Sequence, residues 1–187
     1  MTRDYGVLNT FPKILRNNAE VYSDRPCIRE KEYGIWQTMS WSTFYQNAKI
    51  LALSLKENGL KRGDKISIIG DNRPNLYLTI AAAQLLGAIP VPCYQDSVAD
   101  ELQYILEHAE VKIAVVEDQE QVDKVLEILD KLPKLNTIFF DDPRGLENYN
   151  NTEIKSLREV LNKRENLDYS WLESEINNTG KEEIAVM

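Results

Sequence analysis

Polar, often acidic residues follow four apolar segments that have the length of buried strands. These residues are 70–73, 94–97, 117–119 and 141–142. The carboxyl ends of parallel strands meet at one edge of a sheet, where open α/β proteins bind ligands. Carboxylates gathered at this edge could hold Mg²⁺, which prefers oxygen ligands. The edge is therefore the first place to look for chemistry.

Helix capping is the simpler interpretation of the same residues. Asp71, Asn72, Asp96 and Ser97 stand just before expected helices. Side chains of these types accept hydrogen bonds from the free N–H groups of a first helical turn, and carboxylates also suit the helix dipole. The capping interpretation and the ligand interpretation both remain open at this point.

Other residues with chemical potential lack the partners that a reaction needs. Arg73 at an expected helix start could meet an anion, but an exposed ion pair is the simpler prediction. His108 is the single histidine, and no nucleophile is placed beside it by any motif. The 70–75 turn carries one glycine where a dinucleotide fold has three. Cys27 and Cys93 have no zinc-like spacing and are predicted to be free thiols.

The spacing of the apolar segments predicts the fold that positions these residues. Strands are expected at 65–69, 89–93, 112–116 and 136–140, with amphipathic helices in the intervals. Strands that alternate with helices indicate parallel pairing, with helices on both faces of the sheet. The predicted fold is α/β, a three-layer, mostly parallel, doubly wound sheet.

The two ends of the chain differ from this regular pattern. Residues 1–40 are predicted to be a lead-in, with a helix near 11–19 and a β-hairpin of strands 26–31 and 35–39. Residues 41–187 are predicted to form the α/β subdomain, opening with a helix at Ser40 or Ser42 that Asn58-Gly59 closes. A polar helix at 153–163, a short segment at 171–176 and an apolar strand at 184–187 complete the prediction. Because this last strand is cut short, we expect the domain to be incomplete. The three tryptophans, Trp36, Trp41 and Trp171, are predicted to be core or staple residues.

Composition excludes several classes of protein. The 187 residues are 43% hydrophobic and carry a formal net charge of −8. Nucleic-acid surfaces need clustered Lys and Arg, so this charge argues against them. No apolar run approaches the ~20 residues of a membrane-spanning helix. Two free thiols and the absence of an apolar leader predict a cytoplasmic protein.

A set of short motifs resembles the N-terminal region of acyl-CoA synthetases of the adenylate-forming superfamily, in particular the bacterial long-chain fatty acid branch. The similarity runs from about Pro26 to Tyr149 and is strong as a set. The motifs are Asp24-Arg25-Pro26, Met39-Ser40-Trp41-Ser42-Thr43-Phe44, Leu60-Lys61-Arg62-Gly63-Asp64, Asn72-Arg73-Pro74 with Gly87-Ala88-Ile89-Pro90, Tyr94-Gln95-Asp96-Ser97, and Asp142-Pro143-Arg144-Gly145-Leu146.

The resemblance implies a ligase that uses ATP and Mg²⁺ to convert a long-chain fatty acid to an acyl-adenylate, and then transfers the acyl group to CoA. The family's Ser/Thr/Gly-rich phosphate loop follows a strand like 184–187, so its catalytic motifs are not expected within this chain. No catalytic residue and no metal ligand is therefore assigned. The resemblance suggests a CoA-facing role for Tyr94, Gln95, Asp96 and Ser97, and helix capping remains the alternative for this loop.

The leading hypothesis is an N-terminal fragment of a long-chain fatty acid–CoA ligase that is inactive alone and binds no cofactor tightly. Its partner would be the remainder of the synthetase, docked on an exposed apolar patch. Peripheral membrane contact and a homodimer remain open. The alternative is a non-catalytic α/β binding or regulatory module that partners a synthetase. A version of this module with Asp71, Asp118 and Asp141 around Mg²⁺ lacks the expected pair of adjacent acids.

Overall fold

A computed structural model describes residues 6–163 and 168–187, so residues 1–5 of the predicted lead-in lie outside it. The elements in chain order are α1 (Phe11–Val21), β1 (Pro26–Glu32), β2 (Ile35–Ser40), α2 (Trp41–Glu57), β3 (Lys65–Ile69), α3 (Pro74–Leu85), β4 (Ile89–Cys93), α4 (Ala99–His108), β5 (Val111–Val116), α5 (Gln119–Glu127), a 3₁₀ turn (Leu129–Lys131), β6 (Thr137–Phe140), β7 (Ile154–Ser156), α6 (Leu157–Asn162) and α7 (Ser170–Asn178).

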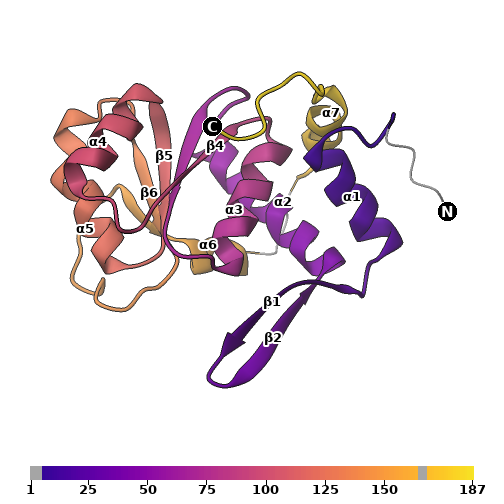
Figure 1. The fold of residues 1–187 in the computed structure, drawn as a ribbon, viewed down its shortest axis with the longest axis horizontal. Helices are drawn as coiled ribbons and strands as arrows, with labels where there is room; N and C mark the ends of the chain where they lie inside the picture. The colour runs from indigo at the N-terminus through magenta and orange to yellow at the C-terminus, as the bar shows by residue number, and fades with distance from the viewer. Residues whose placement is uncertain (1–5, 164–167) are drawn as a thin grey trace.

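The main sheet has five parallel strands in the order β4-β3-β5-β6-β7. Side chains of a strand alternate between its two faces, and each face has its own core. Ile113, Val115 and Phe139 pack with α2, α3 and α6, whereas Ala114 and Ile138 pack with α4 and α5. Figure 1 shows the sheet between these two helical layers. The predicted three-layer, doubly wound α/β fold is confirmed.

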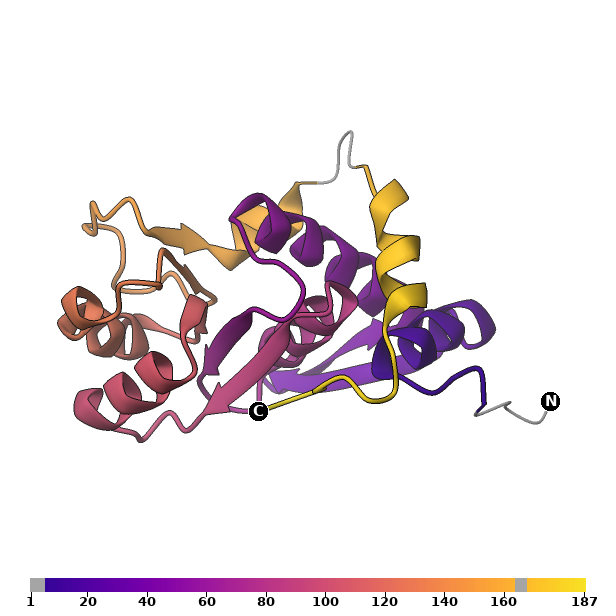
Figure 2. The ribbon, with the colours of Figure 1, turned by 90° about the horizontal axis from the view of Figure 1, so that it is seen from above.

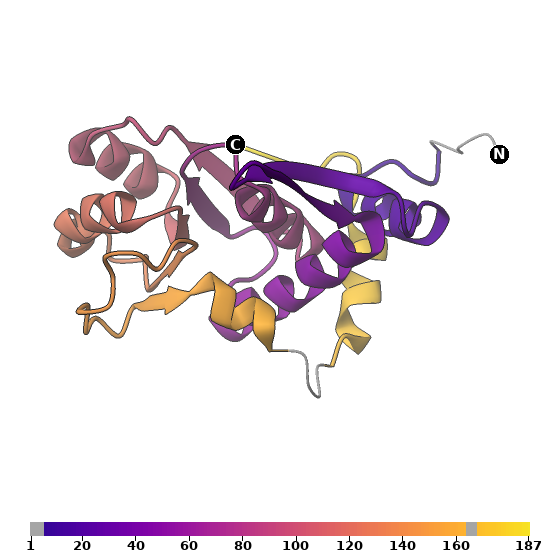
Figure 3. The ribbon, with the colours of Figure 1, turned by 90° about the horizontal axis from the view of Figure 1, so that it is seen from below.

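The β1–β2 hairpin precedes this sheet and projects from the body of the molecule (Figure 1). Its two-residue turn places Tyr33 and Gly34 at φ 49° and 79°. Positive φ at both positions suits the twist of a tight hairpin. The hairpin leads directly into α2, as Figure 3 shows from below, and Ser40 Oγ accepts a hydrogen bond from Thr43 N–H (3.2 Å). The predicted core position of Trp36 is wrong, because this side chain is 64% exposed on the hairpin.

The region 153–163 is only partly helical, which corrects the predicted helix. Its first residues form β7, in which Ile154 pairs with Ile138 of β6, and α6 begins only at Leu157. A strand of three residues carries too little periodicity to be distinguished from a polar helix in the sequence.

The segment 184–187 was predicted to be a strand and is not one. It lies exposed beside β4, as Figure 2 shows from above, and one backbone bond joins Met187 N–H to Pro90 C=O (3.0 Å). Pro90 and Pro92 have no N–H group, so β4 offers no donor at these two positions for a further strand. The missing donors explain why no ladder forms along this segment.

Candidate functional site

The carboxyl edge of the sheet contains the place where open α/β folds bind ligands. The chain leaves β3 through α3 toward β4 on one side, and it leaves β5 through α5 toward β6 on the other. The strand order therefore reverses between β3 and β5, and a crevice is expected at the carboxyl ends of these two strands. Residues 70–73 follow β3 and residues 117–119 follow β5, so the sequence placed the right residues at this edge.

Glu117 fills this crevice. Its Oε2 accepts a hydrogen bond from Asp71 N–H (2.5 Å), and its Oε1 pairs with Arg73 Nε (3.1 Å). Arg73 also reaches Glu30 on the hairpin with a 2.7 Å contact. These bonds to Glu30 and Glu117 raise the pKa of Arg73. The crevice thus holds an internal ion triad, and the predicted ion pair of Arg73 is confirmed.

Close packing at Gly70 brings the turn after β3 near Glu117. A Cβ atom at Gly70 would lie 2.6 Å from Glu117 Cβ and 2.7 Å from Leu76 Cδ1. Only glycine therefore fits this turn beside the triad. Residue 117 was expected at this edge, but its contacts with Asp71 and Arg73 could not be predicted, because they depend on β3 and β5 being neighbours.

The capping interpretation is wrong for the four residues to which it was applied. Helix α3 begins after Arg73, and Asn72 Oδ1 instead accepts a hydrogen bond from Tyr77 OH (3.0 Å). Helix α4 begins after Val98, whose N–H donates to Glu101 Oε2 (3.3 Å). The side chains of Asp71, Asp96 and Ser97 do not cap α3 or α4 either. Asp118 does cap α5, with its Oδ1 accepting from Gln121 N–H (3.2 Å).

Two further acids of this edge, Asp141 and Asp142, are also engaged. Asp141 Oδ1 accepts from Asn75 Nδ2 (2.8 Å), and Asp142 pairs with Arg144 (2.5 Å). Among the residues that the structure describes, no three His, Cys, Asp or Glu side chains gather as metal ligands would. Glu117, Asp118, Asp141 and Asp142 thus bind other groups of the chain.

Burial raises the pKa of Asp141 above its ordinary value of 3.8, while Asn75 and Arg158 oppose this shift. A carboxyl whose folded pKa is raised stabilises the fold below its ordinary pKa, and this contribution is lost as pH rises through the folded value. Asp141→Asn is therefore expected to gain stability relative to the natural protein as pH rises from 4 to 7. Urea unfolding across this range measures the difference.

Asp142→Asn is the matched control, since the Arg144 side chain lowers the pKa of Asp142. The stability of this variant relative to the natural protein should fall as pH rises through the lowered pKa to the ordinary value of 3.8, and it should change little above that, because the missing carboxylate stabilises the fold only when it is ionised. If the stabilities of the two variants changed with pH in the same way, the raised pKa of Asp141 and the lowered pKa of Asp142 would be contradicted.

Two hollows lie on either side of the Glu117 triad. One, of about 540 Å³, is bordered by residues 70–72, Tyr77 and residues 93–96. The other, of about 630 Å³, lies between the hairpin and the edge and is bordered by Arg73, Asp141 and Arg158. Both hollows are large enough for a small ligand and are the candidate binding sites of this edge.

The predicted Tyr94–Ser97 loop forms one wall of the smaller hollow. Tyr94 is 86% exposed, and the loop closes as a turn in which Ser97 N–H donates to Tyr94 C=O (3.2 Å). Lys124 Nζ donates to Gln95 C=O (2.7 Å) and so anchors the loop to α5. Tyr77, on α3, is 45% exposed and borders the same hollow. Two tyrosine rings and the Asn72 amide thus face a space open to a ligand.

The sequence profile of the AMP-binding enzyme family matches residues 15–187. The chain belongs to this family. A long-chain-fatty-acid–CoA ligase of Xenopus laevis is 27% identical over 164 residues, which cover 88% of this chain and 20% of that protein. A 4-hydroxybutyrate–CoA ligase of Metallosphaera sedula is 33% identical over 132 residues, which cover 70% of this chain and 23% of that protein.

Solved structures share the fold. A long-chain-fatty-acid CoA ligase from Rhodopseudomonas palustris superposes with a TM-score of 0.69 at 21% identity, over 81% of this chain and 36% of that one. Acetoacetyl-CoA synthetase from Streptomyces lividans superposes with a TM-score of 0.72 at 18% identity, over 81% of this chain and 24% of that one. The chain spans about a fifth of the length of the curated relatives named above. The AMP-binding family and the α/β fold that the motifs predicted are confirmed, and the chain matches one part of each of these proteins.

Within the described residues, no helix combines the length and the apolar character needed to cross a bilayer.

Proposed function

We propose that this chain is the N-terminal portion of a long-chain fatty acid–CoA ligase. The complete enzyme would use ATP and Mg²⁺ to form an acyl-adenylate with release of diphosphate, and CoA would then take the acyl group with release of AMP. The family match over residues 15–187 carries the proposal, together with the long-chain ligases among the relatives. The two free thiols fit the reducing cytoplasm, where we place the enzyme.

The chain supplies a scaffold for this reaction and not its reacting groups. The turn after β3, where a phosphate loop would be sought, holds one glycine and is filled by Glu117. Groups that bind ATP and Mg²⁺ would therefore come from the remainder of the ligase. The isolated chain should form no acyl-adenylate.

A chimaera tests this proposal. The matching part of the Rhodopseudomonas palustris ligase would be replaced by this chain, and fatty-acid-dependent ATP–diphosphate exchange and acyl-CoA formation would be measured. The chimaera should be active, whereas the isolated chain and the ligase with that part deleted should not. Exchange by the isolated chain would contradict the scaffold role, and a folded chimaera without exchange would favour the alternative of a non-catalytic module.

We further propose that Tyr94, Gln95, Asp96 and Ser97 face CoA. The hollow of about 540 Å³ beside them is bordered by the exposed rings of Tyr94 and Tyr77, and aromatic faces are suited to stacking on a purine. The Asn72 amide adds a polar group beside the rings. These features support a site for the nucleotide part of CoA at this loop.

In the active chimaera, Tyr94→Ala is expected to raise the KM for CoA by about fivefold to a hundredfold, since stacking on a base contributes ~1–3 kcal/mol. The rate of ATP–diphosphate exchange should stay unchanged, because that half-reaction does not use CoA. Tyr104→Ala is the matched control, since Tyr104 is 69% exposed on α4 and does not border the hollow. An unchanged KM for Tyr94→Ala would argue against the CoA-facing loop.

A further inference from the structure

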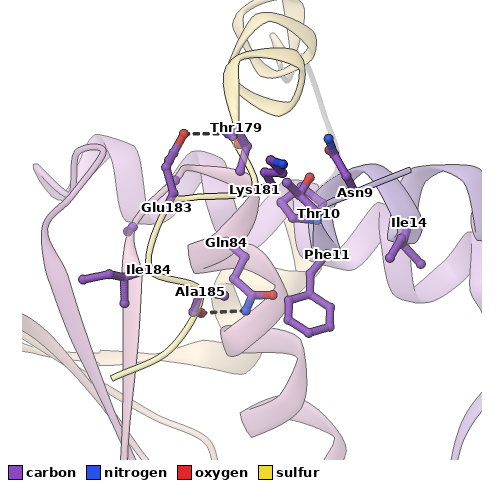
Figure 4. A pocket seen from close by; sticks show the side chains of 14 residues that line it. Asn9, Thr10, Phe11, Ile14, Gln84, Thr179, Lys181, Glu183, Ile184 and Ala185 are labelled. Atoms are coloured by element: carbon purple, nitrogen blue, oxygen red, sulfur yellow. Dashed lines mark hydrogen bonds between the residues drawn. The ribbon is translucent and has the colours of Figure 1, made fainter. Parts of the chain in front are cut away.

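A separate cavity lies at the opposite edge of the sheet from the two hollows described above. It has a volume of about 250 Å³ and lies between the start of α1, the end of α3 and the segment 179–185 (Figure 4). Since α3 runs back from the carboxyl edge, its last turn stands at the amino end of β4. Most of the lining is apolar and comes from Phe11, Pro12, Ile14, Ala88, Ile184 and Ala185.

Hydrogen bonds and an ion pair hold the segment 179–185 against the rest of the molecule. Gln84 Nε2 donates to Ala185 C=O (2.8 Å), a contact visible in Figure 4, and Lys13 Nζ donates to Thr179 C=O (2.9 Å). Arg62 Nη1 pairs with Glu183 at 2.6 Å. The segment is therefore tethered along its length, while Phe11 and Ile184 remain 60% and 61% exposed. The apolar side chains that line the cavity therefore remain accessible to an apolar ligand.

Two polar side chains of the lining, Thr10 and Lys181, could still form a hydrogen bond or an ion pair with a ligand. Thr10 is only 9% exposed, and in the described part of the chain its Oγ1 has no hydrogen-bond partner. Lys181 is 70% exposed, and its one ion pair among the described residues is a 3.7 Å contact with the neighbouring Glu182. The Glu183 carboxylate, in contrast, is already paired with Arg62. The cavity thus combines an apolar interior with a cation that an anionic ligand could engage.

We propose that this cavity binds an alkyl carboxylate of medium length, with the alkyl chain among the apolar residues and the carboxylate at Lys181. At ~30 Å³ for each water-sized group, 250 Å³ holds roughly eight methylene-sized groups. The site is therefore matched to an alkyl chain of about eight carbons. It lies away from the Tyr94 loop and does not depend on the ligase activity.

The test is a titration of the 187-residue chain with sodium octanoate, followed through backbone and side-chain amide NMR signals. Saturable shifts are expected at Gly87, Thr179, Gly180 and the Gln84 side chain. Octanol should bind up to about fivefold more weakly, because it lacks the charge that pairs with Lys181. Acetate should leave these signals unmoved. Shifts that do not saturate, or that centre on the hairpin or the Tyr94 loop, would overturn the assignment.

Variants then locate the site without disturbing the core. Ala185→Phe fills the cavity from an exposed segment and should weaken octanoate at least about tenfold, while Val186→Phe adds the same ring at a position outside the lining. Lys181→Gln should lower the affinity for octanoate to that for octanol, and Lys134→Gln serves as its control. Octanoate binding that is equal in Ala185→Phe and in Val186→Phe would exclude this cavity.

Discussion

Replacing Phe139 with alanine is expected to lower the free energy of unfolding by about 3–5 kcal/mol. Phe139 belongs to β6 and is fully buried in the core that the sheet shares with α2, α3 and α6. Truncation removes a large apolar surface from this core and leaves a cavity that the surrounding strands and helices cannot fill, so both losses add. Urea unfolding of the natural protein and the variant measures the change.

Phe11→Ala is the matched control, because the Phe11 side chain is 60% exposed. A surface truncation of this kind should cost less than about 0.5 kcal/mol. The comparison separates the effect of burial from the loss of a phenyl ring as such. If the two variants lost similar amounts of unfolding free energy, the burial of Phe139 between the sheet and helices α2, α3 and α6 would be contradicted.

Gly70→Ala is expected to cost about 3 kcal/mol, because a small-to-large change in a well-packed site forces strain on its neighbours. The new methyl group would meet Glu117 Cβ at 2.6 Å, and a Cβ atom cannot rotate away as the end of a long side chain can. Relief requires Glu117 to move, which would break its bonds to Asp71 N–H and Arg73. The variant should therefore lose stability and also the closed crevice between β3 and β5.

Gly34→Ala is the comparison for backbone strain without crowding, because Gly70 also has a positive φ (153°) and its substitution combines both effects. Gly34 has a φ of 79° in the hairpin turn, and a Cβ there meets nothing within 4 Å. Its cost should be limited to the ~1–2 kcal/mol of a left-handed conformation for an L-residue. If Gly70→Ala cost no more than Gly34→Ala, the close packing against Glu117 would be disproved.

The apolar pattern of the sequence was enough to predict the helices and strands in which apolar residues recur at regular intervals. The buried strands β3 and β5 and the amphipathic helix α2 occur where the sequence placed them, and Ser40 caps α2 as its position suggested. Their residues alternate or repeat over several turns, so the apolar pattern and the observed burial agree. The family resemblance used motifs along the same elements and was also correct.

The errors concern features that depend on contacts distant in sequence. The cap assignments failed because Asn72 and Ser97 each lie one residue before the N-cap, and side-chain type alone does not determine where a helix begins. The apolar segment 184–187 has the composition of a strand, but it lies against an edge where two prolines have removed the donors. Glu117 stands directly after β5, and only the strand order reveals that this position is the switch point.

The DNA that follows the Met187 codon tests most directly whether this chain is one part of a larger ligase. We expect the reading frame to continue in register into a Ser/Thr/Gly-rich loop and several hundred further residues of the ligase. A stop codon with no related coding sequence behind it would contradict the ligase assignment. The protein would then be a non-catalytic module, and the Tyr94 loop would have to be examined as part of an interface.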